Sequence, residues 1–340
     1  MTLQLGKLPN KLLKKLLEKL TIADPRVLQG PGIGEDTAHI SFGNKTLIVK
    51  SDPITFATDN LGWYALNVNA NDIATSGAVP KWFTATILLP EGVTEEYVED
   101  LFGQLETAAR ELNVSLIGGH TEVTLGLDHP IICGTIFGEI HASKALTTSG
   151  AKEGDAVLMY GFGGIEGTAI LASEVEPQLI KLGMSKEKVK KAKGLLVRPG
   201  ISIVKPALAA AATGLVTSMH DATEGGISTA LNELCMASGN GISIEKGRIP
   251  FLDETTEICD LLEIDSLGLI SSGALLMTTD KKNIDTVIGI LEKDGFTATC
   301  IGKITKPPNI SFNNPNEFSA PIPNFQKDEL VRFFEKIRRK

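Results

Sequence analysis

The chain has 340 residues and a formal net charge of −8, from 33 basic and 41 acidic side chains. A typical domain has about 150 residues, so we expect two domains, and the 42% of apolar residues is enough for packed layers. The acidic balance argues against a broad positive surface, so we expect no nucleic-acid partner.

The apolar segments and the cysteine spacing indicate the cellular compartment of the protein. No run of about 18 apolar residues is present, so we expect neither a membrane helix nor a membrane partner. The N-terminus has no apolar signal-peptide core. The four cysteines are widely spaced and match neither a CxxC pair nor a disulfide framework. We therefore expect buried thiols and a cytoplasmic protein.

The first half of the chain predicts alternating helices and strands. Leucines three and four residues apart over residues 10–20 are typical of an amphipathic helix. Glycines and a proline over residues 29–36 predict a loop, and a strand over residues 46–51 places Asp52 at its end. Further elements are expected as a helix over 61–76, a strand over 81–89, a helix over 94–112, and strands over 114–117 and 130–140.

The second half predicts a separate α/β unit. Residues 145–155 are small, polar and contain glycine, so we place the boundary there, with domains at 1–147 and 148–340. A strand over 156–160, an alanine-rich helix over 204–212 and a strand over 297–301 follow. The order of elements predicts an α+β domain followed by an α/β domain.

Acidic residues recur near the predicted ends of elements. Asp36, Asp52, Asp72 and Asp221 each have an ordinary explanation, because a single aspartate beside a helix start usually caps it. Their number favours a second explanation, since Mg²⁺ prefers oxygen ligands and is held by carboxylates together with substrate phosphates. These residues predict a magnesium-nucleotide site.

Two histidines and one glycine turn are weaker signals. His120 and His220 have side chains that titrate near neutral pH, but an isolated histidine is more often structural than catalytic. Neither has a cysteine or second histidine at zinc spacing. The glycine turn over residues 161–164 follows a strand but has neither the GxGxxG spacing nor a lysine-serine ending.

Four ordered motifs together resemble a known superfamily. They are Gly32 to Ala38, Asp59 to Ala78, Gly118 to Glu122, and Met219 to Ile227. Over roughly residues 28–305 the chain resembles the superfamily of aminoimidazole ribonucleotide (AIR) synthetase, selenophosphate synthetase, thiamine monophosphate kinase and hydrogenase maturation factor E. The second half is most similar to hydrogenase maturation factor E, and residues 61–66 are similar to thiamine monophosphate kinase.

The resemblance implies a PurM-like fold: an α+β N-terminal domain whose sheet dimerises, and an α/β C-terminal domain. It implies ATP and Mg²⁺ as cofactors, with ATP sites at the interface of a homodimer. Metal contacts are implied for Asp36, Asp52, Asp72 and Asp221, and a catalytic role is implied for Asp221. Nucleotide contacts are implied for Gly34, Asp36, Asp52, Asn71, Asp72, Gly118, Gly119, Thr121 and Glu122.

The chain departs from its relatives at three positions. Thiamine monophosphate kinase has aspartate where this chain has His120. Hydrogenase maturation factor E ends in a cysteine that carries the reacting group, whereas the last cysteine here is Cys300, so we expect no covalent carriage on the tail. Selenophosphate synthetase uses a reactive cysteine or selenocysteine near its N-terminus and releases AMP, whereas the first cysteine here is Cys133.

The resulting expectation is an Mg-dependent enzyme that uses ATP to phosphorylate an oxygen of a small-molecule or amide-like acceptor and releases ADP. Two alternatives stay open. The chain is a thiamine monophosphate kinase, or it is a low-turnover ATP-binding assembly factor.

Overall fold

The computed structural model describes residues 6–55, 60–141, 145–313 and 319–338. Asp59 of the second motif lies outside these ranges. The described chain divides into an N-terminal unit, residues 22–31 and 36–145, and a C-terminal unit, residues 6–21, 32–35 and 146–338. Two short segments therefore group with the C-terminal unit: one precedes β1, and the other, residues 32–35, lies between β1 and β2. The domain boundary after residue 147 stays a prediction.

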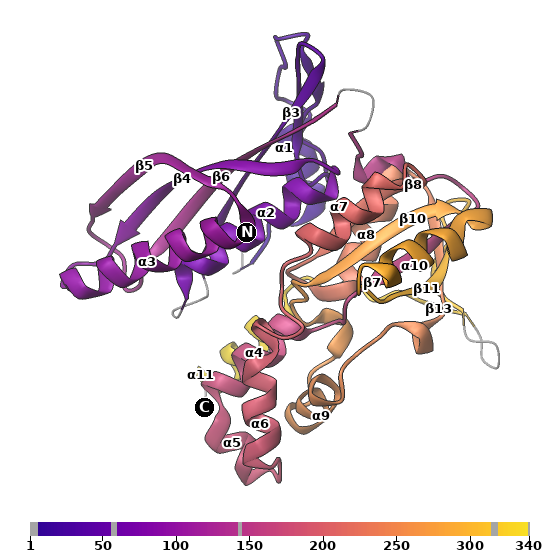
Figure 1. The fold of residues 1–340 in the computed structure, drawn as a ribbon. Helices are drawn as coiled ribbons and strands as arrows, with labels where there is room; N and C mark the ends of the chain where they lie inside the picture. The colour runs from indigo at the N-terminus through magenta and orange to yellow at the C-terminus, as the bar shows by residue number, and fades with distance from the viewer. Residues whose placement is uncertain (1–5, 56–59, 142–144, 314–318, 339–340) are drawn as a thin grey trace. The chain divides into compact units, whose positions relative to one another are not determined.

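The N-terminal unit is a mixed sheet with two helices. Its elements are β1 (Val27–Gln29), β2 (Ala38–Phe42), β3 (Lys45–Ile54), α2 (Leu61–Thr75), β4 (Val79–Leu89), α3 (Glu95–Leu112), β5 (Ser115–Val123) and β6 (Ile131–His141). The strand order is β1-β2-β3-β6-β4-β5, with β4 and β5 parallel and the other neighbours antiparallel. Helix α2 packs against β3 and β6, and α3 packs against α2 (Figure 1). This arrangement is the predicted α+β layer.

Two glycines of β6 let α2 approach the sheet closely. Gly134 and Gly138 are four residues apart, so they lie on the same face of the strand. A Cβ atom added at Gly134 would lie 2.7 Å from Asn69 Nδ2, and one at Gly138 would overlap the side chain of Ile73. Because the two strand positions carry no side chain, α2 can bury polar residues such as Asn69 directly against the sheet.

The C-terminal unit is a seven-stranded sheet with helices. Its strand order is β13-β12-β9-β11-β7-β10-β8, antiparallel except between β12 and β9. The elements are α1 (Asn10–Leu17), η2 (Thr148–Gly150), β7 (Asp155–Tyr160), α4 (Ile165–Glu174), α5 (Glu176–Lys181), α6 (Lys186–Lys193), α7 (Val204–Ala212), β8 (Val216–Ala222), α8 (Gly226–Ser238), β9 (Gly241–Ile244), α9 (Asp253–Leu262), β10 (Ala274–Asp280), α10 (Ile284–Lys293), β11 (Ala298–Thr305), β12 (Ile310–Phe312), β13 (Ala320–Pro321) and α11 (Glu329–Arg338).

The core of this unit lies around β10. Residues 274–279 of this strand are all buried, which requires cover on both faces of the sheet. Ile227 and Leu231 of α8 pack with Leu276 in one apolar cluster. A second cluster joins α4, α5, α6, α9 and α11, with Leu171 and Phe333 among its buried members. The sequence and structure therefore agree on an α/β unit in the second half.

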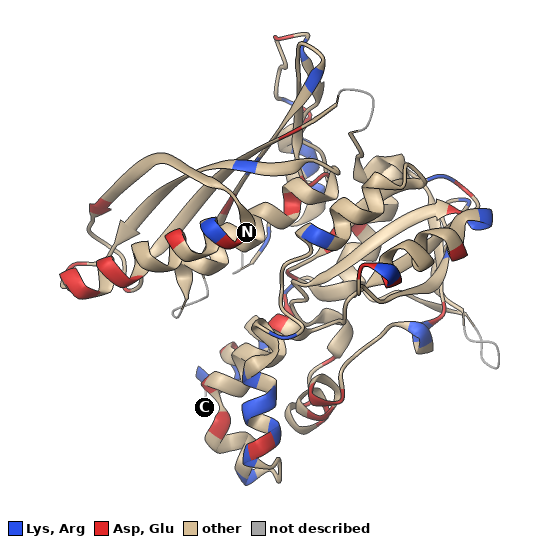
Figure 2. Ribbon diagram, viewed as in Figure 1, with Lys and Arg blue, Asp and Glu red and all other residues tan. Residues whose placement is uncertain are grey.

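Charged side chains on the helices of the second cluster are largely paired. Helix α6 is rich in lysine (Figure 2), and Lys188 and Lys193 lie 2.5 and 2.6 Å from Glu257 and Glu176 respectively. These pairs neutralise much of the positive charge on α6. Among the described residues, no helix is long and apolar enough to cross a membrane.

Most predicted elements are confirmed within a few residues, and three expectations need correction. The strand predicted over residues 114–117 continues to Val123, because it pairs with β4 as far as Leu89, so Gly118 to Glu122 lie within β5. The strand predicted over residues 46–51 extends to Ile54, so Asp52 lies inside β3 and not at its end. Pairing with the long strand β6 continues to Ile54, which keeps β3 extended through Pro53. Cys133 and Cys300 are only half-buried, whereas Cys235 and Cys259 are buried as expected.

The close approach of α2 to β6 generates a stability prediction. Gly134→Ala places a methyl group against Asn69 and the ring of Phe83, and overpacking of this kind costs about 1–3 kcal/mol. We expect the free energy of unfolding in urea to fall by that amount. Gly103→Ala in α3 is the control, since its added Cβ meets nothing within 4 Å, and it should slightly stabilise the helix. Equal stability of the wild type and Gly134→Ala would contradict the packing argument.

Candidate functional site

Two of the predicted aspartates of the N-terminal unit contact the same lysine side chain, that of Lys50. Lys50 and Asp52 are two residues apart on β3, so their side chains share a face of the sheet. Lys50 Nζ lies 3.4 Å from Asp52 Oδ2 and 3.2 Å from Asp72 Oδ2 on α2. The side chain of Asp72 is only 5% exposed, whereas that of Asp52 is 39% exposed. The two carboxylates therefore form a partly open anionic site that holds a positive charge.

Asn69 fixes the backbone beneath this site. Its Oδ1 accepts a hydrogen bond from the Asp52 N–H at 3.0 Å, and its Nδ2 donates to the Asp52 carbonyl at 3.4 Å and to the Ala65 carbonyl at 2.8 Å. Asn69 is fully buried, and its neighbour Asn71 is 1% exposed. Asparagine is a poor helix former, so this pairing with β3 explains its place within α2.

The third motif lies at the opposite side of the same sheet. Asp52, Gly134, Ala85 and Gly119 pair in sequence across β3, β6, β4 and β5. Neighbouring strands are about 4.8 Å apart, so Asp52 and Gly119 are separated by about 14 Å. The predicted residues Gly118, Gly119, Thr121 and Glu122 therefore do not join Asp52 and Asp72 within one chain.

Strand β5 is exposed along its whole length. A Cβ atom at Gly119 would overlap the Ala85 carbonyl on β4, so packing within the sheet already requires glycine at this position. His120 Nε2 lies 3.1 Å from Glu122 Oε2, and both side chains are largely exposed. Nothing in this arrangement marks His120 as a catalytic base.

The first motif is anchored to the C-terminal unit. The Glu35 carboxylate accepts hydrogen bonds from the backbone N–H groups of Thr148 and Ser149 in η2, each at 3.1 Å. Gly34 has a φ of +77°, and a Cβ atom there would lie 2.5 Å from the Glu233 carbonyl on α8. Gly34 is thus required by local packing. Asp36 follows directly and begins the second segment of the N-terminal unit.

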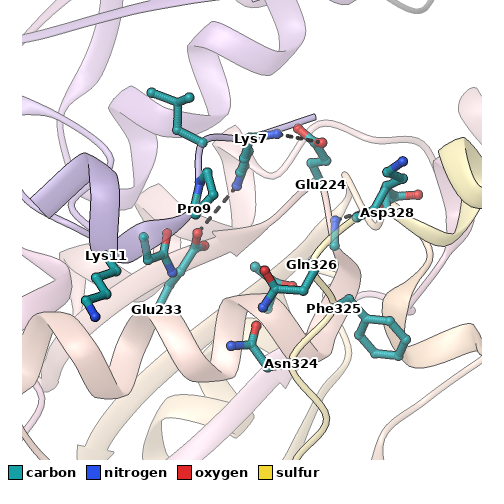
Figure 3. A pocket seen from close by; sticks show the side chains of 14 residues that line it. Lys7, Pro9, Lys11, Glu224, Glu233, Asn324, Phe325, Gln326 and Asp328 are labelled. Atoms are coloured by element: carbon teal, nitrogen blue, oxygen red, sulfur yellow. Dashed lines mark hydrogen bonds and ion pairs between the residues drawn. The ribbon is translucent and has the colours of Figure 1, made fainter. Parts of the chain in front are cut away.

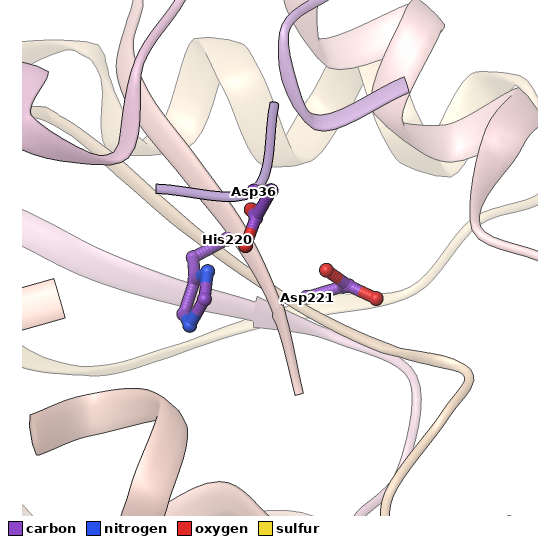
Figure 4. Close-up of side chains that lie close together, drawn as sticks. All are labelled: Asp36, His220 and Asp221. Carbon is purple, nitrogen blue, oxygen red and sulfur yellow. The ribbon is translucent and has the colours of Figure 1, made fainter. Parts of the chain in front are cut away.

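Two further motif residues lie on β8. His220 and Asp221 are 4% and 3% exposed, and Figure 4 shows their side chains at the end of the strand. His220 Nε2 lies 3.2 Å from Glu233 Oε2 on α8. Burial by itself raises the pKa of Glu233, but the hydrogen bond from His220 and the nearby charge of Lys7 more than offset this and hold the pKa at about 2. His220 therefore hydrogen-bonds a carboxylate that is ionised at neutral pH.

A pair of buried carboxyl groups was not predicted. Burial raises the pKa of Glu166 on α4 to about 7, and the charge of Asp328 adds to this effect. Burial likewise raises the pKa of Asp328 to about 7, although its oxygens accept hydrogen bonds from the N–H groups of Gly225 and Leu330 at 2.6 and 2.8 Å. Among the described residues, Glu166 Oε2 has no hydrogen-bond partner. Both groups favour the protonated form more than an exposed carboxyl does.

This pair predicts a pH-dependent stability. Folding raises the pKa of such an acid. Its stabilising contribution is fully present when the pH is below the pKa of the unfolded state, and it is lost as the pH rises through the pKa of the folded state. For Glu166 the loss runs from about pH 4.5 to 7, at about 1.4 kcal/mol per pH unit. The contribution of Glu166 to the free energy of unfolding in urea should therefore be about 2 kcal/mol lower at pH 7.5 than at pH 5.

The matched variants isolate that contribution. Glu166→Gln cannot ionise, so it should lose about this much of the pH dependence, whereas Glu99→Gln on the exposed surface of α3 should retain all of it. A pH dependence in Glu166→Gln as steep as in the wild type would contradict the prediction.

Comparison with known proteins matches both halves of the chain. Residues 34–140 match the N-terminal domain of AIR synthase related proteins, and residues 152–313 match their C-terminal domain. A protein of Methanocaldococcus jannaschii named for hydrogenase expression and formation is 30% identical over 317 residues, which is 88% of this chain and 89% of the relative.

Relatives with named activities are more distant. Carbamoyl dehydratase HypE of Escherichia coli is 25% identical, over 79% of this chain and 76% of its own. Thiamine-monophosphate kinase of Escherichia coli O157:H7 is 29% identical, over 81% and 84%. Among solved structures, Escherichia coli HypE gives a TM-score of 0.73 at 22% identity, covering 95% of this chain and 99% of that one. AaThiL complexed with AMPPCP and TMP gives 0.70 at 20% identity, covering 91% and 94%. These structures confirm the PurM-like two-domain fold.

Proposed function

The chain belongs to the AIR synthase-related family, and on that basis we propose that it is a magnesium-dependent enzyme that uses ATP to phosphorylate an oxygen of a small-molecule or amide-like acceptor. The observation that carries the proposal is that the carboxylates of Asp52 and Asp72 both lie next to the Lys50 ammonium group. Mg²⁺ is bound in proteins by one or two carboxylates together with substrate phosphates, and this pair supplies such oxygens.

The names of the relatives support the use of a nucleotide. AaThiL was solved with the ATP analogue AMPPCP, and a HypE structure carries ATP. In our proposal Asp36, Asp52, Asp72 and Asp221 are the metal ligands. The groups assigned to nucleotide contact are Gly34, Asp36, Asp52, Asn71, Asp72, Gly118, Gly119, Thr121 and Glu122.

The donor set fits a divalent cation, and Lys50 bears on how it binds. The Lys50 ammonium lies between the two carboxylates and neutralises part of their charge. A bound Mg²⁺ would supply a stronger positive charge beside the phosphates and offset charge that develops during transfer. Lys50 would then turn toward a phosphate oxygen, since a lysine binds phosphate as a point charge. Sequence reasoning missed this lysine because its spacing matches no motif.

The proposed reaction transfers the terminal phosphoryl group of ATP. An acceptor oxygen attacks the γ phosphorus in line, the bond between that phosphorus and the β–γ bridging oxygen breaks, and ADP leaves. If the oxygen belongs to a hydroxyl group, its proton passes to solvent. Asp221 acts mainly as the transfer proceeds, so its contribution belongs to the transition state more than to ATP binding.

A thiamine monophosphate kinase is the second candidate. The 29% identity to such an enzyme over 295 residues favours it, and AaThiL was solved with TMP. An ATP-binding assembly factor with little turnover is the third, favoured by the relative named for hydrogenase formation. Steady-state ATP hydrolysis with and without thiamine monophosphate or small amides separates the three.

Two matched variants test the site. Asp72→Asn keeps the size of the side chain but removes a charged ligand, so calorimetry should find Mg-ATP affinity at least tenfold weaker. Asp221→Ala should retain affinity within a few-fold and lower the rate at least a hundredfold. Phosphorus NMR of the wild-type reaction should accumulate ADP. Unchanged affinity in Asp72→Asn would reject the metal site, and AMP as the primary product would reject the assigned reaction.

We also propose that the protein is a homodimer formed through β5. All nine residues of β5 are exposed, and Leu116, Ile117 and Val123 are 42–57% exposed. An exposed apolar edge strand is a surface that pairs with another chain.

Sedimentation tests the assembly. The wild type at micromolar concentration should sediment at about twice 36.2 kDa, and Ile117→Glu should shift it to the monomer, because a charge in an apolar interface is costly. Phe102→Glu, at a residue of α3 that is 47% exposed, is the control and should remain dimeric. A wild type that sediments only as a monomer would count against the proposal.

A further inference from the structure

The C-terminal unit contains a cavity of about 260 Å³. Three segments line it: residues 7–11, the start of α8 with the loop before it, and residues 324–328 (Figure 3). At the roughly 30 Å³ that a water molecule occupies in the liquid, this volume holds on the order of ten non-hydrogen atoms. The cavity is therefore sized for a compact small molecule.

Two carboxylates on one wall face a single lysine. The Lys7 backbone N–H donates to Glu224 Oε1 at 3.3 Å, and Lys7 Nζ lies 3.5 Å from Glu233 Oε1 (Figure 3). Glu233 is 13% exposed and accepts a second hydrogen bond from His220. The carboxylates are thus held by the body of the unit, whereas the positive charge comes from a segment near the N-terminus.

The positive charge contributed by Lys7 is weakly held. Its side chain is 46% exposed, and exposed ion pairs contribute about 0–1 kcal/mol. A second lysine on the cavity wall, Lys327, is already engaged, since its Nζ lies 2.8 Å from both carboxylate oxygens of Glu335. Another cation that reached Glu233 would therefore displace the Lys7 ammonium from that carboxylate at small cost.

The same wall offers a further polar group. Thr229 Oγ1 is shielded from solvent and has no hydrogen-bond partner among the described residues, and Thr229 lines the cavity. A buried hydroxyl without a partner costs about 1–3 kcal/mol. A ligand that displaced the atoms covering this hydroxyl and hydrogen-bonded to it would remove this cost.

We propose that this cavity binds a compact small molecule that carries a protonated amine or guanidinium group, and that Lys7 takes the place of that group when no ligand is bound. The ligand's cation lies against Glu224 and Glu233, and its polar body lies near Thr229. Glu233 on the cavity wall lies 3.2 Å from Nε2 of His220, the neighbour of Asp221 on β8, and on this ground we assign the ligand as the acceptor in the proposed reaction. That role rests on the proposed function, whereas binding itself requires no ATP.

Calorimetry with agmatine tests the proposal, because this probe has both an amine and a guanidinium group. The uncharged 1,5-pentanediol is the neutral probe. Lys7→Met should bind agmatine about fivefold more tightly than the wild type, since the internal competitor is gone. Glu224→Gln and Glu233→Gln should each bind it at least tenfold more weakly, because each removes one charge from the cation site.

The control is Lys14→Met, on the exposed side of α1 and outside the cavity lining, which should bind as the wild type does. Agmatine affinity that is equal in all variants, no binding by Lys7→Met, or equally tight binding of the diol would each overturn the proposal. Thermal melting of every variant verifies that it is folded. If the wild type hydrolyses ATP but does not bind agmatine, the ligand proposal for the cavity is rejected and the proposed function is not.

Discussion

The N-terminal site depends on one hydrogen-bonded contact between a helix and a strand. The Asn69 side chain pairs with both the N–H and the carbonyl of Asp52, and it reaches them because Gly134 has no side chain. A buried amide with satisfied hydrogen bonds fixes the helix position more strictly than an apolar contact does, since misplacing it leaves polar groups unpaired. Lys50, Asp52 and Asp72 are held in place by the same contact.

Much of the fold was predictable because its signals are local. Leucine spacing and strand composition located α1 and β4 within a few residues, and the helix predicted over residues 94–112 is α3. The asparagines of α2 are poor helix formers, so their place in the helix needs a reason other than helix propensity. That reason was invisible in the sequence, because the partners of Asn69 lie on β3, 17 residues earlier in the chain.

The remaining features of the site depend on contacts between distant segments. No spacing indicated that Lys50 would lie between Asp52 and Asp72, since a lysine in a strand is usually a solvated side chain. Glu35 lies within the first motif, but its role as a hydrogen-bond acceptor depends on η2, 113 residues later in the chain. The raised pKa values of Glu166 and Asp328 arise from burial, which sequence composition reports only on average. Motif spacing therefore located candidates, and tertiary packing decided their environment.

The grouping of residues 6–21 with the C-terminal unit has a consequence for synthesis. The partner of Lys7 on α8 lies 226 residues later. A ribosome adds about 5–20 residues per second, so the N-terminal segment waits on the order of 10–45 seconds for that partner to be made. The N-terminal sheet is completed during this interval. Residues 6–21 are thus among the last described residues to find their place, which makes this segment a natural point for a chaperone or a fused tag to interfere with maturation of the protein.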